Sequence, residues 1–566
     1  MRFLTAAVLF VVSVLLILAG VAYRTIWLPP THYTEIISID TKNPLVTVSH
    51  SVISKYAGNP VVVASGPAKV QVAVGRQSDV AAWVGDTSHT LVNSNGDRPR
   101  VVQTPGVGVF ANPAGSDLWR EETAGNSSAK IRVNTAEDAA LLLSSDGISP
   151  APQQLKITWN VPVDTTGSRL LLIAGGIVLL IAIVMNWIAW YTMRRDRGPR
   201  RRTPKAPQGP RLRQRSKNFV APTKGRRSAK NFAVVGTLVA LPLALSGCGF
   251  IGSSPQVSPT ATTTAALVKL DPPVVTQKQL KKIVDRVAAS VSIADANHDP
   301  KMLAERVAGP ALSARQAHYQ LQGASKNVPN LPAVLTDSLK FGLPAASNQW
   351  PRVVMALATG GQSKALPQML VLQQESPRSQ YQLWYDIDML PGVATPAVSA
   401  TSVGAIPVAA DSLFLKISPN ALPTAFGNLI DLGPSSLSAP MFDVTKDEFY
   451  HQVSQSQAVQ KANLHNGKIT VTHALGNPNV MSLSTANSGA LVAVYMSDTY
   501  VIKPNKATQA VAVQGNEKLL LGAAGSASGI RSVYGTMLLF YVPAVASPDK
   551  ILTLGATQVL ISVRGL

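Results

Sequence analysis

The sequence predicts a multi-domain membrane protein, with an all-β sandwich-like exterior domain between two transmembrane helices and an α+β C-terminal region. Three observations lead to this fold class. The 566 residues are 46% hydrophobic and only 14% charged, whereas about 25% of residues are charged in soluble domains. Two long uncharged segments lie near the N-terminus and before residue 194. Between them, apolar and polar residues alternate in short runs, which is typical of strands.

The first element, residues 1–23, is predicted to be a transmembrane helix or signal anchor. Phe3–Tyr23 supplies about twenty apolar residues behind Arg2, which is enough to cross a bilayer core of about 30 Å. Gly20-Val21-Ala22 is a poor small-x-small cleavage site. A cleaved signal peptide is therefore the weaker alternative.

Residues 24–168 are expected to form the exterior β-rich domain. Runs such as "AKVQVAVG", "DVAAWVG" and "QLKITWNVPV" alternate in character, so Val70, Val72 and Val74 should point to one face of a strand. Gly, Asn, Asp and Pro separate the runs, and no long helical pattern appears. Two sheets packed face to face are the natural fold for such a chain.

A second transmembrane helix is predicted at residues 169–193, and a basic cytoplasmic loop at residues 194–230. Leu170–Trp190 is uncharged and ends in aromatic residues that suit a membrane interface. The loop holds fifteen Lys and Arg against one Asp, which is +14 of the formal net charge of +21. Positive loops stay in the cytoplasm, so residues 24–168 are expected outside. A further membrane-directed segment at residues 231–248 follows the loop, so residues 249–566 are expected outside as well.

The basic loop has a second interpretation as a nucleic-acid arm, because Lys and Arg neutralise phosphates. Only Phe219 offers a stacking ring, however, and the loop lies between two membrane-directed segments. We therefore expect no nucleic-acid partner. Contact with anionic lipid headgroups is a secondary role.

The only cysteine follows a segment at residues 231–248 that has the form of a lipoprotein signal. About fourteen apolar residues follow a basic stretch, which is short for a membrane span but right for a signal-peptide core. A lipobox and a Ser/Thr/Pro-rich tether at residues 249–270 come next; the lipobox consists of Leu245, Ser246, Gly247 and Cys248. This order predicts acylation at Cys248, with a buried cysteine as the alternative. A single cysteine excludes an internal disulfide and a Cys-based zinc cluster.

The position of the lipobox leaves three possibilities open. Cleavage before Cys248 would give two envelope proteins from one chain. Without cleavage, Phe232–Phe250 would be a third, short membrane segment. A fusion of two reading frames is the third possibility, because Met193 could begin a lipoprotein with a long basic leader.

The C-terminal region is expected to contain two α+β units, residues 271–395 and 441–566, joined by a Pro/Ala-rich connector at residues 396–440. Capping boxes at Thr276–Gln279 and Thr445–Glu448 begin helices in the two units. Further helices are expected from Asp299-Pro300 and over Leu312–Leu321, and strands follow the helices in both units. This element order resembles the nuclear transport factor 2-like architecture, which implies cone-like units with a concave sheet.

Several patterns approach catalytic motifs without completing them. Asp386 and Asp388 in "YDIDML" resemble a DxD metal site and would share one face of a strand. Ser127–Lys130 fits S-x-x-K, but its companion motifs are missing, and Gly525–Gly529 lacks the serine of a nucleophile elbow. The eight histidines have no metal-ligand spacing. No catalytic residue, metal or cofactor is therefore expected, with Asp386 and Asp388 as a weak acid-pair candidate.

The stretch "VVVASGPAKVQVAVGRQSDVAAWVGDTSHTLV" (Val61–Val92) and the Ala/Val/Pro-rich composition are similar to those of uncharacterised actinobacterial cell-envelope proteins. The resemblance implies a compartment and no activity. We therefore expect a non-catalytic envelope protein, membrane-spanning and lipid-anchored, that binds a partner, a lipid or wall material. The alternatives are an envelope enzyme acting on wall polymer or glycan, and a structural subunit of an envelope assembly.

Overall fold

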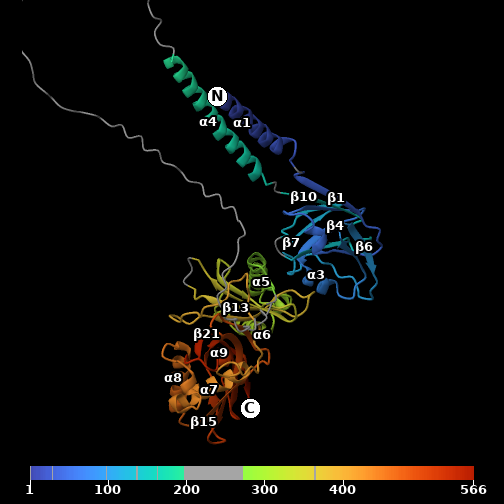
Figure 1. The fold of residues 1–566 in the computed structure, drawn as a ribbon. Coiled ribbons are helices and arrows are strands. Elements are labelled where there is room, and N and C mark those ends of the chain that lie inside the picture. Colours follow the sequence, from blue (N-terminus) through green and yellow to red (C-terminus); the bar gives the residue numbers. More distant parts are fainter. Residues whose placement is uncertain are drawn as a thin grey trace, which may run out of the picture. The chain divides into compact units, whose positions relative to one another are not determined.

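The computed structural model describes residues 2–28, 30–96, 98–135, 138–161, 164–196, 272–361 and 365–566 (Figure 1). The chain divides into two compact units. Of the described residues, 2–28 and 164–196 belong to one unit, and those between 30 and 161 together with those between 272 and 566 belong to the other. The prediction of a multi-domain chain with β-rich regions is confirmed.

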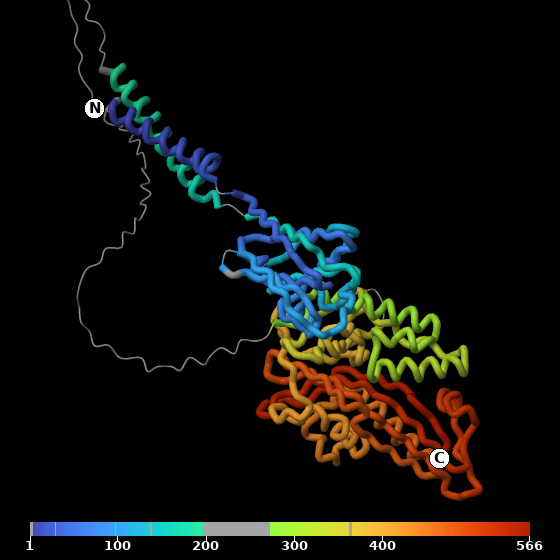
Figure 2. The backbone as a smooth tube through the Cα atoms, turned by 90° about the vertical axis from the view of Figure 1, so that its right-hand side faces the viewer, coloured from blue at the N-terminus to red at the C-terminus, as the bar shows by residue number. Residues whose placement is uncertain are grey.

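Two apolar helices, α1 (Arg2–Thr25) and α4 (Thr166–Asp196), make up the first unit and lie side by side (Figures 1 and 2). The Ser13 hydroxyl donates to the Gly175 carbonyl at 2.9 Å. A Cβ at Gly175 would approach the backbone nitrogen of Ile17 to 3.1 Å, so glycine permits the close packing of the two helices. Both helices are long and apolar enough to cross a membrane.

Residues 29–163, the β domain, fold as two sheets around one core. The four-stranded sheet has the order β1-β10-β3-β8 and the six-stranded sheet β6-β5-β2-β9-β4-β7, in which β2 and β5 are parallel. Residues from both sheets share the core, including Val62 and Val72. The strands are β1 (His32–Ser38), β2 (Leu45–Val48), β3 (Val61–Ser65), β4 (Val70–Arg76), β5 (His89–Asn95), β6 (Arg98–Thr104), β7 (Glu121–Gly125), β8 (Ser128–Arg132), β9 (Ala139–Ser144) and β10 (Gln154–Asn160).

The β domain is not all-β, because the predicted strand "DVAAWVG" forms helix α3 (Gln77–Val84). Val80, Trp83 and Val84 are spaced three and four residues apart, so a helix places all three on one face. That face packs against the outer side of the six-stranded sheet. The short helix α2 (His50–Ile53) is a second departure. Val70, Val72 and Val74 of β4 do face the sandwich core together, as predicted.

Residues 272–566 contain two larger antiparallel sheets. The first is the meander β11-β12-β13-β14, and the second has the order β15-β17-β20-β21 with β16 on β17. The strands are β11 (Ser338–Pro344), β12 (Arg352–Thr359), β13 (Gln368–Gln374), β14 (Gln382–Asp388), β15 (Gly467–Leu475), β16 (Met481–Ser484), β17 (Ala490–Pro504), β18 (Val511–Ala512), β19 (Gly525–Ser526), β20 (Ile530–Val542) and β21 (Leu552–Gly565). The helices are α5 (Gln277–Asn297), η1 (Pro300–Leu303), α6 (Gly309–Ala324), η2 (Pro419–Ala421), α7 (Leu422–Leu432), η3 (Gly433–Ser435), η4 (Ala439–Met441), α8 (Glu448–Asn463) and α9 (Gly515–Leu521).

The two predicted α+β units are not separate, because one hydrophobic core runs through both. Leu370 of β13 and Leu539 of β20 belong to the same buried cluster. The Asp388 backbone N–H donates to the Thr557 hydroxyl at 2.8 Å, which ties the end of β14 to β21. The expected connector at residues 396–440 is also structural, since it contains α7, whose apolar side packs into a second core.

Side-chain caps fix where several helices begin. The capping box at Thr276 is confirmed, because the Thr276 hydroxyl accepts from the Gln279 N–H and the Gln279 side-chain carbonyl oxygen accepts from the Thr276 N–H. The box predicted at Thr445–Glu448 is wrong. Asp447, an equally good N-cap residue, accepts from the Tyr450 N–H at 2.8 Å. The helix expected from Asp299 is only the turn η1, whereas Leu312–Leu321 lies within α6.

Gly427 in α7 is predicted to tolerate no side chain. A Cβ there would overlap the Cβ of His473 on β15, so Gly427→Ala should destabilise the fold by about 1–3 kcal/mol through overpacking. Gly323 in α6 is the matched control, because a Cβ there meets nothing within 4 Å. Gly323→Ala should stabilise by about 1 kcal/mol through helix propensity. Thermal unfolding of both variants measures the difference, and equal shifts would contradict the prediction.

Candidate functional site

The residues singled out in the sequence are not gathered into one site. Cys248 and the lipobox residues Leu245, Ser246 and Gly247 lie outside the described residues. Ser127 and Lys130 are both exposed where a turn enters β8. Within the described ranges, no three His, Cys, Asp or Glu side chains converge to hold a metal ion.

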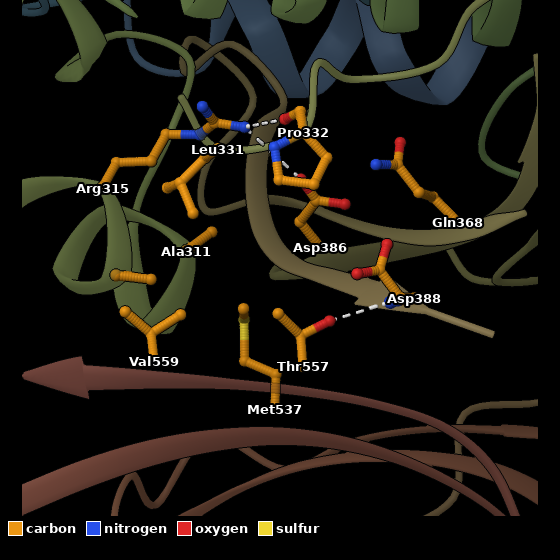
Figure 3. A pocket seen from close by; sticks show the side chains of 11 residues that line it. Ala311, Arg315, Leu331, Pro332, Gln368, Asp386, Asp388, Met537, Thr557 and Val559 are labelled. Carbon is orange, nitrogen blue, oxygen red and sulfur yellow. Dashed lines mark hydrogen bonds and ion pairs between the residues drawn. The ribbon is translucent and has the colours of Figure 1, made fainter. Parts of the chain in front are cut away.

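Asp386 and Asp388 on β14 line a cavity of about 30 Å³ beneath α6 (Figure 3). An Arg315 nitrogen lies 3.5 Å from Asp386 and another 2.6 Å from Asp295, so a guanidinium already takes the place expected for a cation. Burial raises the pKa of Asp386 to about 6, although Arg315 opposes the rise. The cavity has room for about two water molecules and none for a sugar. The DxD interpretation therefore finds no support in this geometry.

Asp386→Asn is predicted to stabilise the protein at neutral pH. The folded-state pKa of about 6 lies above the ordinary value of 3.8, so ionising Asp386 costs stability as the pH rises through about 6. The neutral amide of the variant would remove this cost, about 1–3 kcal/mol at pH 8, and Arg315 would keep Asp295 as its partner. Urea unfolding at pH 8 and pH 4 should show a gain at pH 8 only. Asp40→Asn, at an exposed position, should show no such pH-dependent gain.

The most extensive polar site is the contact between the β domain and residues 272–566, which belong to the same compact unit. Its centre is Asp117, whose side chain is fully buried. One carboxylate oxygen accepts from Arg286 of α5 at 2.8 Å. The other accepts from Arg306 at 2.5 Å and from the Tyr381 backbone N–H at 2.9 Å. A buried carboxylate of one domain is thus neutralised by two arginines of the other.

A second buried ionic contact involves Asp79 of α3. The Arg76 guanidinium donates to both of its oxygens, at 2.9 and 2.7 Å. Arg352, at the start of β12, is fully buried and lies 2.8 Å from the same carboxylate. The Arg352 guanidinium also stacks 3.5 Å above the ring of Trp350. Trp350 itself packs against the β-domain cluster that contains Trp83.

Arg378 forms a third contact, from the turn between β13 and β14. Its guanidinium donates to the backbone carbonyls of Trp83 and Val84 at 2.9 and 3.0 Å. It also donates to the Thr87 hydroxyl at 2.6 Å and to the Val109 carbonyl at 3.3 Å. Arg378 therefore donates hydrogen bonds to the C-terminal end of α3, where helix carbonyls lack partners within the helix.

Exposed ion pairs lie at the edge of these contacts. Lys278 pairs with Glu121 at 2.9 Å, and Lys282 with Glu122 at 3.4 Å. We call the whole contact the docking interface. Its acidic side chains on the β domain are Asp79, Asp117, Glu121 and Glu122, and its basic side chains beyond residue 271 are Lys278, Lys282, Arg286, Arg306, Arg352 and Arg378. The two faces are therefore complementary in charge.

A separate buried ionic cluster lies inside the C-terminal region around His473 of β15. Asp498 of β17 is 2.6 Å from the His473 Nδ1, and Asp431 of α7 is 3.6 Å from the Nε2. Burial alone would lower the pKa of His473, but hydrogen bonds to Asp431 and Asp498 raise it to about 9. Asp498 also accepts from Thr536 at 2.7 Å and from Gln558 at 3.2 Å. The cluster joins α7 to the sheet, and no serine or cysteine is among these partners.

The sequence holds weak signals for the docking interface that are not catalytic motifs. Gln279, Lys282 and Arg286 are spaced by three and four residues on α5, beside the apolar positions of the same helix. All three contact the β domain, and the Gln279 amide, besides closing the capping box, donates to the carbonyls of Asp117 and Leu118. The row of polar residues on α5, beside its row of apolar residues, thus indicated a second face of the helix that makes contacts. Asp117 itself carried no local signal.

Residues 271–562 match the protein family described as "Domain of unknown function (DUF8094)". The match begins just before α5 and ends within β21, so it covers both sheets of the shared core. Neither a curated protein nor a solved structure matches the chain.

Proposed function

Since this chain belongs to the DUF8094 family, we propose that it is a non-catalytic envelope protein whose β domain holds the DUF8094 domain, residues 271–562, on the outer side of a membrane. The observation that carries the proposal is Asp117, a fully buried carboxylate that the DUF8094 domain neutralises through Arg286 and Arg306. Leaving such a charge unpaired is costly. The contact therefore favours one specific docked arrangement over a loose tether.

The proposed topology rests on the order of segments along the chain. Helices α1 and α4 precede and follow the β domain in sequence, and residues 194–230 carry +14. The positive-inside rule places such a loop in the cytoplasm, which puts the β domain outside. The apolar segment at residues 231–248 then directs the chain across the membrane a second time, which puts the DUF8094 domain outside as well. The similarity of Val61–Val92 to actinobacterial envelope proteins supports the same compartment.

A lipid anchor at Cys248 completes the proposed arrangement. The support is the sequence order of basic stretch, apolar segment, lipobox and tether. The partners are then the bilayer, the acyl group and an envelope protein or wall component. The nuclear transport factor 2-like form also remains a proposal, supported by helices that precede antiparallel strands in both halves of the DUF8094 domain.

Labelling of introduced cysteines tests the proposed topology. Asp40 and Leu437 are exposed on the β domain and the DUF8094 domain, and Arg195 is at the end of α4. A membrane-impermeant maleimide should label Asp40→Cys and Leu437→Cys in intact cells, and Arg195→Cys only after lysis. The parent chain gives the background from Cys248. Labelling of either exterior position only after lysis would contradict the topology.

Carbodiimide cross-linking tests the docking itself, because it joins amines to carboxylates that are in contact. Lys278 and Glu121 should yield a cross-linked peptide pair in the purified full chain, as should Lys282 and Glu122. The Lys281–Asp285 pair within α5 is the internal positive control. Recovery of the control pair without any pair joining the two domains would overturn the proposed docking.

Metabolic labelling with a fatty-acid analogue tests the anchor. The label should appear on a fragment that begins at Cys248, and Cys248→Ala should abolish it. Detection of an unlabelled chain of full mass would contradict this part of the proposal.

A further inference from the structure

We infer that the β domain is a receptor that binds the DUF8094 domain without a covalent connection, so that the fitting partner is a DUF8094 domain on a separate polypeptide. This inference rests on the proposed docking and deepens it. If it holds, a chain cut between residues 197 and 271 remains one complex.

The contacts that hold the two domains together lie outside the connecting segment. Asp117, Asp79 and Arg378 each form their contacts with residues well inside the folded domains. The contacts nearest to the connection are those of Arg76 with the carbonyls of Pro272 and Pro273, at 3.0 and 3.3 Å. The only cysteine is Cys248, so no disulfide can join residues 29–163 to residues 272–566. Docking is therefore entirely noncovalent.

The docking interface has the composition of a specific protein–protein contact. Trp350 packs against the cluster that contains Trp83 and Trp119, and Arg352 stacks on Trp350. Binding energy concentrates in buried Trp and Arg side chains surrounded by a polar rim. Lys278–Glu121 and Lys282–Glu122 supply that rim. Two domains that were joined only by a flexible tether would need no such buried centre of Trp and Arg side chains.

Each domain also has a hydrophobic core of its own. The main core of the β domain consists only of residues 37–159, and the main cores of the DUF8094 region only of residues 274–554. The opposite charges of the two faces favour rapid and selective association. A separate polypeptide with the same basic face would meet the same acidic face of the β domain.

Proteolysis in the tether of the Cys248→Ala chain tests the inference, because this substitution removes the acylation that the proposed cleavage before Cys248 requires and so keeps the chain in one piece until it is cut. A protease recognition sequence inserted at residues 255–265 lets the chain be cut after purification in detergent, which frees a DUF8094 fragment without Cys248 or an apolar segment. With the chain immobilised by an N-terminal tag, the fragment should stay bound after cleavage. Because the fragment then has no membrane anchor, retention reports the docking interface and not a shared micelle.

Two variants and a control make the result specific. Asp117→Arg should weaken retention by about 30-fold or more, the range of interface hot spots. Arg378→Ala removes hydrogen bonds of a partly exposed side chain and should weaken retention by about 10-fold. Arg378 is in an exposed turn, so Arg378→Ala is expected to leave the fold intact. It therefore still tests the interface if Asp117→Arg fails to fold. Arg564→Ala, at an exposed position on β21, should behave as the parent. Equal retention of the parent and Arg378→Ala fragments would overturn the assignment of the interface.

The outcome also separates this inference from the proposed function. Release of the parent fragment at micromolar concentration, while the uncut chain still yields the Lys278–Glu121 cross-link, would overturn the inference and leave intramolecular docking in place. Loss of the cross-link in the uncut chain would overturn both. Retention of the parent together with release of Asp117→Arg supports the receptor role.

Discussion

Replacing Asp117 by alanine is expected to destabilise the docked arrangement by about 3–5 kcal/mol, the cost of breaking a buried ion pair. The side chain is fully buried between Arg286 and Arg306, and its loss leaves both guanidinium groups without their carboxylate. The Tyr381 N–H loses its acceptor as well. The carbodiimide cross-link between Lys278 and Glu121 should therefore decrease, and the thermal unfolding of the full chain should begin at lower temperature.

The matched control for Asp117 is Asp40→Ala, which removes an exposed carboxylate from the same domain and should change neither measurement. A double-mutant cycle then isolates the pair, because Arg286→Ala in the Asp117→Ala background should cost less than in the parent. Additive effects of the two substitutions would show that Asp117 and Arg286 do not act together.

The second large effect concerns the pH dependence of the DUF8094 domain. The pKa of His473 is raised to about 9 by its hydrogen bonds to Asp431 and Asp498, against the effect of burial. The unfolded value is about 6.5. Protonated His473 therefore stabilises the fold fully below pH 6.5, and this contribution is lost as the pH rises through about 9. We expect the unfolding free energy to fall by about 3 kcal/mol between pH 7 and pH 10 from this group.

Two variants test the assignment to His473. His473→Gln should flatten the alkaline part of the stability profile, whereas His465→Gln, at an exposed position, should leave it unchanged. Asp498→Asn should cost about 3–5 kcal/mol at pH 7, because it leaves a buried imidazolium with one carboxylate fewer. Denaturant titrations across the pH range measure both effects. If His473→Gln loses as much unfolding free energy at alkaline pH as the parent does, another titrating group is responsible for the loss.

Much of the fold could be predicted because local patterns dictate it. Uninterrupted apolar runs predicted α1 and α4, alternation predicted β4 and β10, and the hydroxyl and amide of Thr276 and Gln279 predicted the start of α5. The error at α3 has a physical cause. "DVAAWV" fits a helical period as well as a strand period, and only the sheet beneath it favours the helix, because that arrangement buries Val80, Trp83 and Val84 together.

The sites depended on contacts that no local pattern reveals. Asp117 and Arg286 are 169 residues apart, and His473 and Asp498 are 25 apart on neighbouring strands. Asp386 and Asp388 did form a local pattern, but the Asp386 carboxylate lies 3.5 Å from an Arg315 nitrogen, and the Asp388 contact with Thr557 is made by its backbone N–H. The single shared core of the DUF8094 domain was equally hidden, because two runs of helices followed by strands look alike whether their sheets pack together or apart.

The sequence by itself determined the two apolar helices, the basic segment, the β-rich composition and the start of α5, since each follows from the side chains of one short stretch. Only the tertiary structure decided which charges are buried together. Burial removes water from a charge, so the partner brought close by folding determines whether that charge stabilises the protein. For Asp117 that partner comes from the other domain, and this contact is one of those that support the proposed role of the β domain as a receptor.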